Sequence, residues 1–452
     1  MTNPSGRTKF RVKLEQFIQS IRSDILSGKR QVGDFLPSEK ALSGQFGLSN
    51  NSIRKGLDVL LAEGLIEKIP KVGNKIVTPP GNTEFTIRFG YHPTVLEEAA
   101  LHLLLNDFHD QFPHIQVVPV PIQNNSIDEY IKAGLLDAVT LNYNNFRSFM
   151  EADLLDMLEP QEPSPQIYPY LNKAFSSDGE LLVQPFIFSP LVICYNKKHF
   201  TEAGLLEPDS SWTWGDLIDN ALKLSEKNDG LGFYVHLFSN NRWPVFLLQS
   251  GYRFQKGENG RYQVTGTSCI EGLRVCKDLL QQFKIPPIFE NEAEAEKLFL
   301  EEHVSIIMTN YFRLNRLSGA SFPYDIAPIP YLNQARTLML TIGLALCSNS
   351  KKKEAAQILI DYLISYRAQL LIRQHTLSVP SLKTAAEWVG KESMYRPSRF
   401  HLYREIAPTF SLYTDLNLKE SQLNAALREA KLYWSGLSSE QTVCSRLEEI
   451  LN

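Results

Sequence analysis

The chain has 452 residues, too many for one ordinary hydrophobic core, so two or three domains are expected. Its 43% hydrophobic and 21% charged residues are typical of a soluble globular protein. The first residues lack the apolar segment of a secretory signal, and no stretch approaches the ~20 apolar residues of a membrane span. We therefore expect a cytoplasmic protein without membrane contact.

Charge is distributed unevenly along the chain, whose net charge is −4. Residues 1–80 hold 13 Lys/Arg and 7 Asp/Glu, a net charge of +6. The remainder holds 33 (46 − 13) Lys/Arg and 43 (50 − 7) Asp/Glu, a net charge of −10. This asymmetry indicates that only the front of the chain meets a polyanion such as nucleic acid.

Two amphipathic helices are predicted at the front of the chain. Apolar residues at the helical period predict the first helix from Lys13 onward, and Gly28 follows its end. Ser38 is the predicted N-cap of a second helix, with Leu42 and Phe46 pointing inward.

A third helix and a β-wing are predicted next. Ser49 or Asn50 caps this helix and Gly64 ends it. Two short strands around Lys71-Val72-Gly73 then predict the wing. The buried stripe of the helix is expected to hold Ile53, Leu57, Leu60 and Leu61.

Polar residues crowd at the start of the third helix, the end that a helix-turn-helix inserts into the major groove. Such side chains can hydrogen-bond to bases or phosphates. The exposed face is expected to carry Asn50, Asn51, Ser52, Arg54 and Lys55, with Lys71 on the basic wing. The order helix, turn, helix, basic wing favours a DNA-binding function.

Residues 10–78 resemble the winged-helix domain of GntR-type transcription regulators. The matching residues are Gly28, Gly33, Leu36-Pro37-Ser38-Glu39, Leu42, Ser49, Ile53-Arg54, Leu57, Leu60 and Glu63-Gly64-Leu65-Ile66. The resemblance implies DNA contacts from Lys40, Ser49, Asn50, Ser52, Arg54 and Gly73. Two departures concern specificity. Asn50 stands where Arg is usual, and an asparagine favours adenine over guanine. The wing reads VGNK where G-x-G is usual.

The remaining chain is predicted to form a large α/β domain. We expect a winged-helix domain over 1–78, a Pro/Gly-rich linker over 79–84 and the large domain over 85–452. Strands FTIRFGY, IQVVPVPI and LDAVTLN alternate with helical segments, the first of which is the long VLEEAALHLLLNDFHDQF, and this order predicts a mostly parallel sheet. The stretch NYNNF is expected to be a polar loop, and ENEAEAEKLFLEEH a solvated helix face.

The large domain contains no HExxH, GxSxG or phosphate-binding loop, and its histidines show no metal-ligand spacing. We therefore expect neither an enzyme nor a cofactor or metal. Instead, the order of its motifs resembles family 1 extracellular solute-binding proteins of the maltose-binding type. The matching motifs are ADLLDMLEP, DGELLVQPFIFSPLVICYNKKHFTEAGL, WTWGDLIDNALKL, RWPVFLLQSGYRF, KLFLEEHVSIIMTNYFRL, YDIAPIPYLN, TLMLTIGLALCSNSKKKEAAQILIDYL and LSVPSLK.

This second resemblance implies a two-lobed α/β fold of the periplasmic-binding-protein type II, with the ligand between the lobes. Carried over by motif, its wall is expected to hold Asn142, Tyr143, Asn144, Ser189, Asn240, Trp243, Asn310, Tyr311, Arg313 and Tyr413 or Phe410. Asn amides suit sugar hydroxyls, and aromatic faces stack on sugar rings. Arg313 replaces a common aromatic, which fits either an acidic ligand or a lobe–lobe salt bridge.

The combined hypothesis is a homodimeric regulator that binds operator DNA and responds to a small effector, a sugar or oligosaccharide. Closure of the lobes would change the spacing of the paired front domains. Two alternatives replace the large domain: a pyridoxal-phosphate aminotransferase-like domain, with its lysine in SNSKKK (348–353), or a LacI-like effector domain.

Overall fold

The structure is a computed structural model and describes residues 13–14, 17–18, 20–22, 24–25, 30–62, 64–70, 72–77, 85–123, 126–228, 230–258, 260–285 and 293–452. Gly28, Lys71 and the expected linker 79–84 therefore lie outside the described residues.

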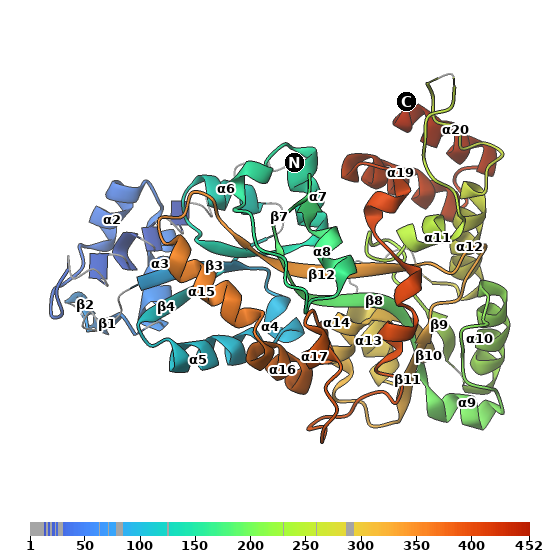
Figure 1. The fold of residues 1–452 in the computed structure, drawn as a ribbon, viewed down its shortest axis with the longest axis horizontal. Helices are drawn as coiled ribbons and strands as arrows, with labels where there is room; N and C mark the ends of the chain where they lie inside the picture. Colours follow the sequence, from blue (N-terminus) through green and yellow to red (C-terminus); the bar gives the residue numbers. More distant parts are fainter. Residues whose placement is uncertain are drawn as a thin grey trace.

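A small winged-helix unit forms the front of the chain (Figure 1). It contains helical residues between 13 and 25, helices α2 (Glu39–Phe46) and α3 (Asn50–Ala62), and the antiparallel strands β1 (Ile66–Ile69) and β2 (Gly73–Ile76). Ser38 caps α2 as predicted, because its hydroxyl accepts a hydrogen bond from the Ala41 amide at 3.2 Å.

The buried face of α3 differs from the predicted stripe. Leu61 is 41% exposed, whereas Ser52 is only 4% exposed. The cause is the close approach of the first helix at Gly56, where an added Cβ would lie 2.5 Å from the Phe17 ring. This contact turns the side of α3 that holds Ser52 and Gly56 inward, and Leu61 outward.

A ten-stranded mixed sheet runs through the large domain. Its first part contains the parallel strands β3 (Phe85–Tyr91), β4 (Ile115–Pro121) and β5 (Ala138–Asn142). The central strands β8 (Gln184–Asn196) and β12 (Thr337–Leu346) are antiparallel to each other and run between two lobes (Figure 1). The expectation of a mostly parallel sheet is therefore wrong at the centre, because two strands cross between the lobes in opposite directions.

Each lobe packs helices against its part of the sheet (Figure 1). The first lobe holds β3–β5 with α5 (Leu101–Gln111), α7 (Tyr143–Glu151), α15 (Lys353–Leu363) and α16 (Tyr366–His375). The second lobe holds β9 (Leu231–Tyr234), β10 (Val304–Asn310) and β11 (Tyr324–Pro328) with α10 (Trp214–Asn228), α11 (Pro244–Gln249), α12 (Cys269–Gln282), α13 (Ala293–Leu300), α19 (Glu420–Trp434) and α20 (Glu440–Leu451).

Two local predictions in the first lobe are wrong. The long helix expected after β3 is divided into α4 (Val95–Glu98) and α5, because Ala100 adopts a left-handed backbone with φ 50°. The expected loop NYNNF forms the first turn of α7, since the Asn142 side chain accepts a hydrogen bond from the Asn145 amide at 2.9 Å and caps the helix.

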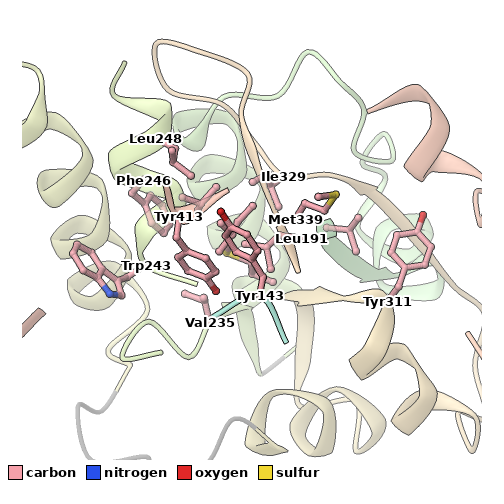
Figure 2. Packing of buried hydrophobic residues seen from close by; sticks show 14 of the residues in the cluster. Tyr143, Leu191, Val235, Trp243, Phe246, Leu248, Tyr311, Ile329, Met339 and Tyr413 are labelled. Atoms are coloured by element: carbon pink, nitrogen blue, oxygen red, sulfur yellow. The ribbon is translucent and has the colours of Figure 1, made fainter. Parts of the chain in front are cut away.

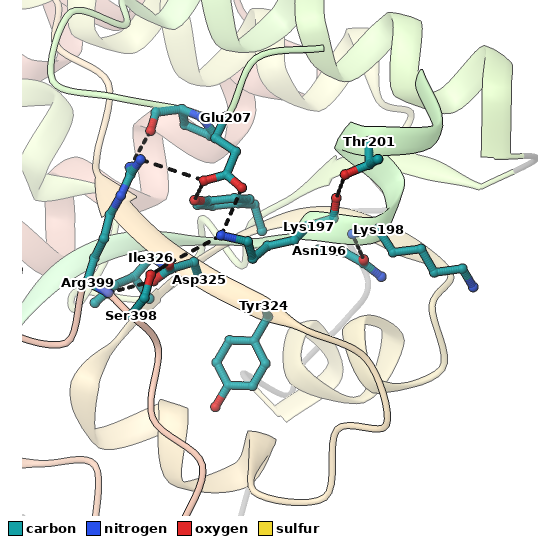
Figure 3. A network of polar contacts seen from close by, with 12 residues as sticks. Asn196, Lys197, Lys198, Thr201, Glu207, Tyr324, Asp325, Ile326, Ser398 and Arg399 are labelled. Carbon is teal, nitrogen blue, oxygen red and sulfur yellow. Dashed lines mark hydrogen bonds and ion pairs between the residues drawn. The ribbon is translucent and has the colours of Figure 1, made fainter. Parts of the chain in front are cut away.

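A buried carboxylate ties β11 and the carboxyl end of β8 to the turn at residues 398–399 (Figure 3). Asp325 on β11 is 1% exposed and accepts hydrogen bonds from the Ser398 hydroxyl and the Arg399 amide. Lys197 at the end of β8 lies 3.7 Å from Asp325 and 2.9 Å from Glu207. These interactions stabilise the part of the second lobe that lies away from the region between the lobes.

Candidate functional site

A cavity of about 220 Å³ lies between the two lobes, where strands β3, β5 and β10 end. In α/β sheets, ligands bind beyond the carboxyl ends of strands, and this cavity has that position. Its lining residues are His92, Thr94, Glu98, Asn142, Tyr143, Asn144, Asn241, Asn310, Phe312, Arg313, Leu340, Thr341, Ile342 and Tyr413. We call this cavity the cleft.

Two tyrosines from different lobes meet at the cleft (Figure 2). Tyr143 begins α7 of the first lobe, and its ring stacks on that of Tyr413 with centroids 6.2 Å apart and planes 13° apart. The Tyr143 hydroxyl hydrogen-bonds to that of Thr414 at 2.9 Å, and the Tyr413 hydroxyl donates to Asn241 at 2.7 Å. The aromatic pair therefore joins the lobes on one side of the cleft.

Further contacts continue this junction along α7. Both carboxylate oxygens of Glu151 accept hydrogen bonds from the Glu420 amide, at 2.9 and 3.0 Å. The Ser148 hydroxyl donates to the Glu420 carboxylate. The first turn of α19 is thus held by α7, and the lobes are in contact on this side.

Two asparagines of the cleft also cap helices. Asn142 caps α7, and Asn310 caps the short helix α14 (Tyr311–Leu314) by accepting from the Arg313 amide at 3.1 Å. Each cap occupies the side-chain oxygen of the asparagine. The cap also fixes the side chain at the end of its strand.

An acidic group forms part of the cleft wall in the first lobe. The Thr94 hydroxyl donates to the Glu98 carboxylate at 3.0 Å and hydrogen-bonds to Nδ1 of His92 at 2.9 Å. Burial raises the pKa of Glu98 to about 7, although the Thr94 hydrogen bond and the nearby Arg313 guanidinium lower it. Burial also lowers the pKa of His92, which favours the neutral imidazole at neutral pH.

Arg313 faces this acid from the second lobe and already has a partner. Its guanidinium lies 2.9 Å from the Glu296 carboxylate, which is only 2% exposed and also accepts from the Thr309 hydroxyl at 3.0 Å. Because Glu296 belongs to α13, the expectation of a fully solvated face for this acidic helix is wrong. Arg313 and Glu296 both belong to the second lobe. Their ion pair is therefore not the salt bridge between the lobes that was one expectation for Arg313.

The neutral variant Glu98→Gln is expected to change how stability depends on pH. Below pH 4.5 Glu98 is protonated whether the chain is folded or unfolded, so it does not lower the free energy of unfolding. Between pH 4.5 and about 7 the unfolded chain ionises more readily, and the stability of the wild-type protein falls. Because Glu98 is only half-buried, solvent screening reduces the ideal value of ~3 kcal/mol, so we expect a relative gain of roughly 1–2 kcal/mol for Glu98→Gln by pH 7.5.

Urea unfolding of both proteins from pH 4.5 to 8 measures this difference. Glu97→Gln is the matched control, because Glu97 is exposed on the same helix and lies 3.7 Å from Arg316 at the surface. Parallel curves for the wild type and Glu98→Gln would contradict the prediction.

Six of the predicted ligand residues line the cleft: Asn142, Tyr143, Asn144, Asn310, Arg313 and Tyr413. Ser189 and Tyr311 do not, because both are fully buried in structural hydrogen bonds. The Ser189 hydroxyl donates to Asn310 and accepts from the Phe312 amide, and it thereby positions α14. The Tyr311 hydroxyl donates to the Phe400 carbonyl at 2.9 Å.

The segment SNNRWP reaches the cleft through a residue that was not predicted. Trp243 is 1% exposed and donates through its indole nitrogen to Asn240, which in turn donates to Asn424 at 2.6 Å. Both predicted residues therefore stabilise the second lobe, and Asn241 between them lines the cleft. Phe410, the alternative to Tyr413, packs against Tyr170 instead.

Sequence reasoning missed eight lining residues: His92, Thr94, Glu98, Asn241, Phe312, Leu340, Thr341 and Ile342. His92 and Thr94 directly follow the predicted strand β3, so the rule that ligands lie beyond strand ends could have identified them. The three β12 residues carry no such signal, because they lie in the middle of a predicted strand.

The winged-helix unit presents a polar surface at the start of α3. Lys40, Asn50, Asn51 and Lys55 are exposed, and Arg54 lies 2.7 Å from Glu39 with 63% of its side chain exposed. Arg54 is therefore held by a surface ion pair and not by packing in the core.

Two serines at this surface have a structural role. The exposed Ser49 caps α3, accepting from the Ser52 amide at 3.3 Å, and the two hydroxyls hydrogen-bond at 2.7 Å. The expected exposure of Ser52 is wrong, because the contact at Gly56 turns this side inward. Gly73 begins β2 and pairs with Ile69 in the predicted wing.

The lysine run 348–353 lies away from the cleft. The Lys352 ammonium donates to the Thr86 carbonyl at 2.6 Å, and that of Lys353 lies 2.7 Å from Glu159. The aromatic and amide residues of the cleft, and not these lysines, are thus the groups available to a ligand there. Among the described residues, no helix combines the length and apolarity that a bilayer crossing requires.

The two units define the class of protein: a winged helix-turn-helix followed by a two-lobed periplasmic-binding-protein type II fold. Residues 93–370 match the family described as bacterial extracellular solute-binding protein, and the chain belongs to this family. Residues 13–76 match bacterial regulatory proteins of the gntR family, so the chain carries the DNA-binding domain of these regulators. Neither matched family is a family of enzymes.

Among curated proteins, the sn-glycerol-3-phosphate-binding periplasmic protein UgpB of Escherichia coli K12 is 23% identical over 162 residues. This match covers 34% of the chain and 37% of UgpB, so the chain spans little more than a third of that relative.

Solved structures show a similar fold. The substrate-binding protein Lmo0181 of Listeria monocytogenes, in complex with cycloalternan, has a TM-score of 0.68 and 20% identity, covering 82% of this chain and 98% of that one. A solute-binding protein of Thermotoga lettingae, bound with α-D-tagatose, has a TM-score of 0.67 and 18% identity, covering 82% and 100%.

Proposed function

We propose that the protein is a sequence-specific DNA-binding transcription regulator whose activity responds to a sugar bound between its lobes. The observation that carries this proposal is the presence in one chain of a DNA-reading helix and a cleft lined by amides, hydroxyls and paired tyrosines. Amide and hydroxyl groups match the hydrogen-bonding capacity of sugar hydroxyls, and aromatic rings supply the apolar surface. Solute-binding proteins of known structure with this fold were solved with sugars.

The site of action is the cytoplasm, where DNA is available, and the working form is a homodimer. Dimers of helix-turn-helix proteins bind two half-sites about one helical turn apart. A ligand that binds the closed lobes better than the open lobes shifts the population toward the closed state. The resulting change in the large domain alters how the two α3 helices are spaced and hence the affinity for the operator.

A DNA-binding titration with the full chain tests this proposal. The operator is first selected from random duplexes, and its affinity is then measured with and without candidate sugars. A sugar that changes operator affinity at least fivefold, corresponding to about 1 kcal/mol of coupling, supports the proposal. Operator affinity that no cleft-binding sugar changes would contradict the regulatory part.

Residues 85–452 produced alone are expected to fold and to bind no DNA. Their cores are separate from the core that includes Phe17, Leu42 and Ile53 in the winged-helix unit, and their net charge is negative. Circular dichroism, thermal melting and gel shifts with the selected operator measure the outcome. An aggregating fragment, or one that still retards the operator, would contradict the two-part organisation.

A further inference from the structure

The charged groups of the cleft are nearly balanced before any ligand enters. Among the described residues that line it, Arg313 carries the one permanent positive charge, because His92 favours its neutral form. The Glu296 carboxylate neutralises Arg313 at 2.9 Å. Glu98 adds a second carboxyl group, in the opposite wall.

This balance disfavours ligands of either charge. A phosphate or carboxylate would meet a guanidinium that is already paired and a carboxyl group that loses its proton near neutral pH. An ammonium group would be repelled by the Arg313 guanidinium, and the half-buried Glu98 would offset this repulsion only in the fraction of molecules in which it is ionised. Transferring an ion from water without a dedicated partner is costly, so an uncharged ligand fits this cleft best.

The size of the cleft sets a second limit. Its volume of about 220 Å³ is below the ~300–1,000 Å³ of sites that enclose drug-sized molecules. On one side, the Tyr143–Tyr413 pair and the hydrogen bonds from Glu420 to Glu151 join the lobes. A linear oligosaccharide would have to separate these contacts.

We propose that the cleft binds an uncharged, hydroxyl-rich molecule of the size of one sugar ring, and not a sugar phosphate, an amino sugar or an oligosaccharide. This inference rests on the proposed function, since it names the class of effector. Its hydroxyls would be held by the amide groups of Asn144 and Asn241, with Leu340 and Ile342 as the apolar floor.

Thermal melting of the full chain with a panel of compounds tests the ligand class. The panel contains D-glucose, D-galactose, D-mannose, D-fructose, D-tagatose and myo-inositol, then glucose 6-phosphate, sn-glycerol 3-phosphate, D-glucosamine, maltose and maltotriose. We expect a rise of several degrees in Tm, growing with concentration, for members of the first group only. A rise with glucose 6-phosphate, D-glucosamine or an oligosaccharide would overturn the inference and leave the proposed function intact, whereas a rise with sn-glycerol 3-phosphate alone would overturn both. No rise with any compound would overturn both.

A charge-changing variant tests the electrostatic reasoning separately. Glu296→Gln keeps the shape of the side chain and leaves Arg313 without its carboxylate. The ratio of affinities for the phosphorylated and free forms of the bound compound should rise at least tenfold. Glu294→Gln is the control on the same helix, because Glu294 pairs with Lys297 at 3.9 Å and does not contact Arg313.

An unchanged ratio in a folded Glu296→Gln protein would overturn the inference. If Glu296→Gln does not fold, Glu98→Gln removes the carboxyl group in the opposite wall of the cleft. This variant should raise the same ratio of affinities. An unchanged ratio in that protein would equally overturn the inference.

Discussion

Replacing Trp243 by alanine is expected to lower the free energy of unfolding of the large domain by about 3–5 kcal/mol. The indole lies in the buried cluster shown in Figure 2 and is 1% exposed. Its centroid lies 6.2 Å from that of Trp434, and its nitrogen donates to Asn240. The truncation leaves a cavity beside α19 and an acceptor on Asn240 without this donor. Both effects act on the stability of the second lobe.

Thermal melting and ligand titration of the same variant measure the two possible roles of Trp243. Leu206→Ala is the control, because Leu206 is 89% exposed and its truncation should change stability by no more than ~0.5 kcal/mol. Well below the melting temperature, ligand affinity should remain near that of the wild type. A melting temperature equal to that of the wild type, together with weakened ligand binding, would contradict this prediction and support the original expectation that Trp243 contacts the ligand.

The double variant Arg54→Ala/Lys55→Ala is expected to weaken operator binding about 10- to 100-fold at low salt. Both side chains are exposed at the start of α3, and Arg54 forms a surface ion pair with Glu39. Each phosphate contact that is lost also removes about 0.9 from the slope of log affinity against log salt. Binding should therefore become both weaker and less dependent on salt.

Fluorescence anisotropy across a series of salt concentrations measures both quantities. Lys223→Ala/Lys227→Ala is the matched control, since these exposed lysines lie on α10 of the second lobe. Glu39→Gln should act in the opposite direction and strengthen binding, because it removes the carboxylate that competes for Arg54. A wild-type slope and affinity for Arg54→Ala/Lys55→Ala would place DNA on another surface.

The sequence predicted the cleft where the lining residues directly follow a strand. Asn142 is the last residue of β5, and Tyr143 and Asn144 follow it. Asn310 is the last residue of β10, and Arg313 lies three residues beyond it. Local patterns locate the end of a strand, and the topology of an α/β sheet then brings such ends together. The six predicted residues that line the cleft are of this type, apart from Tyr413.

The remaining residues depended on contacts that local patterns do not encode. Glu98 lies on the short helix α4, which ends before Ala100, an alanine in a left-handed conformation that composition does not signal. Glu296 is buried because Thr309 and Arg313 supply partners from other elements. Whether an aromatic such as Trp243 faces a ligand or a core is likewise decided by the helices that pack around it.

The lining residues of the cleft extend from His92 to Tyr413, and this spread has a consequence for protein synthesis. The core of the winged-helix unit uses residues 17–76 and is complete early, whereas the cleft lacks Tyr413 until 337 (413 − 76) residues later. At roughly 5–20 residues per second, a ribosome needs on the order of 15–70 s to translate this interval. During that time each new chain holds a finished winged-helix unit without a complete cleft. Under the proposed function, newly made molecules can therefore occupy DNA before any effector can act on them.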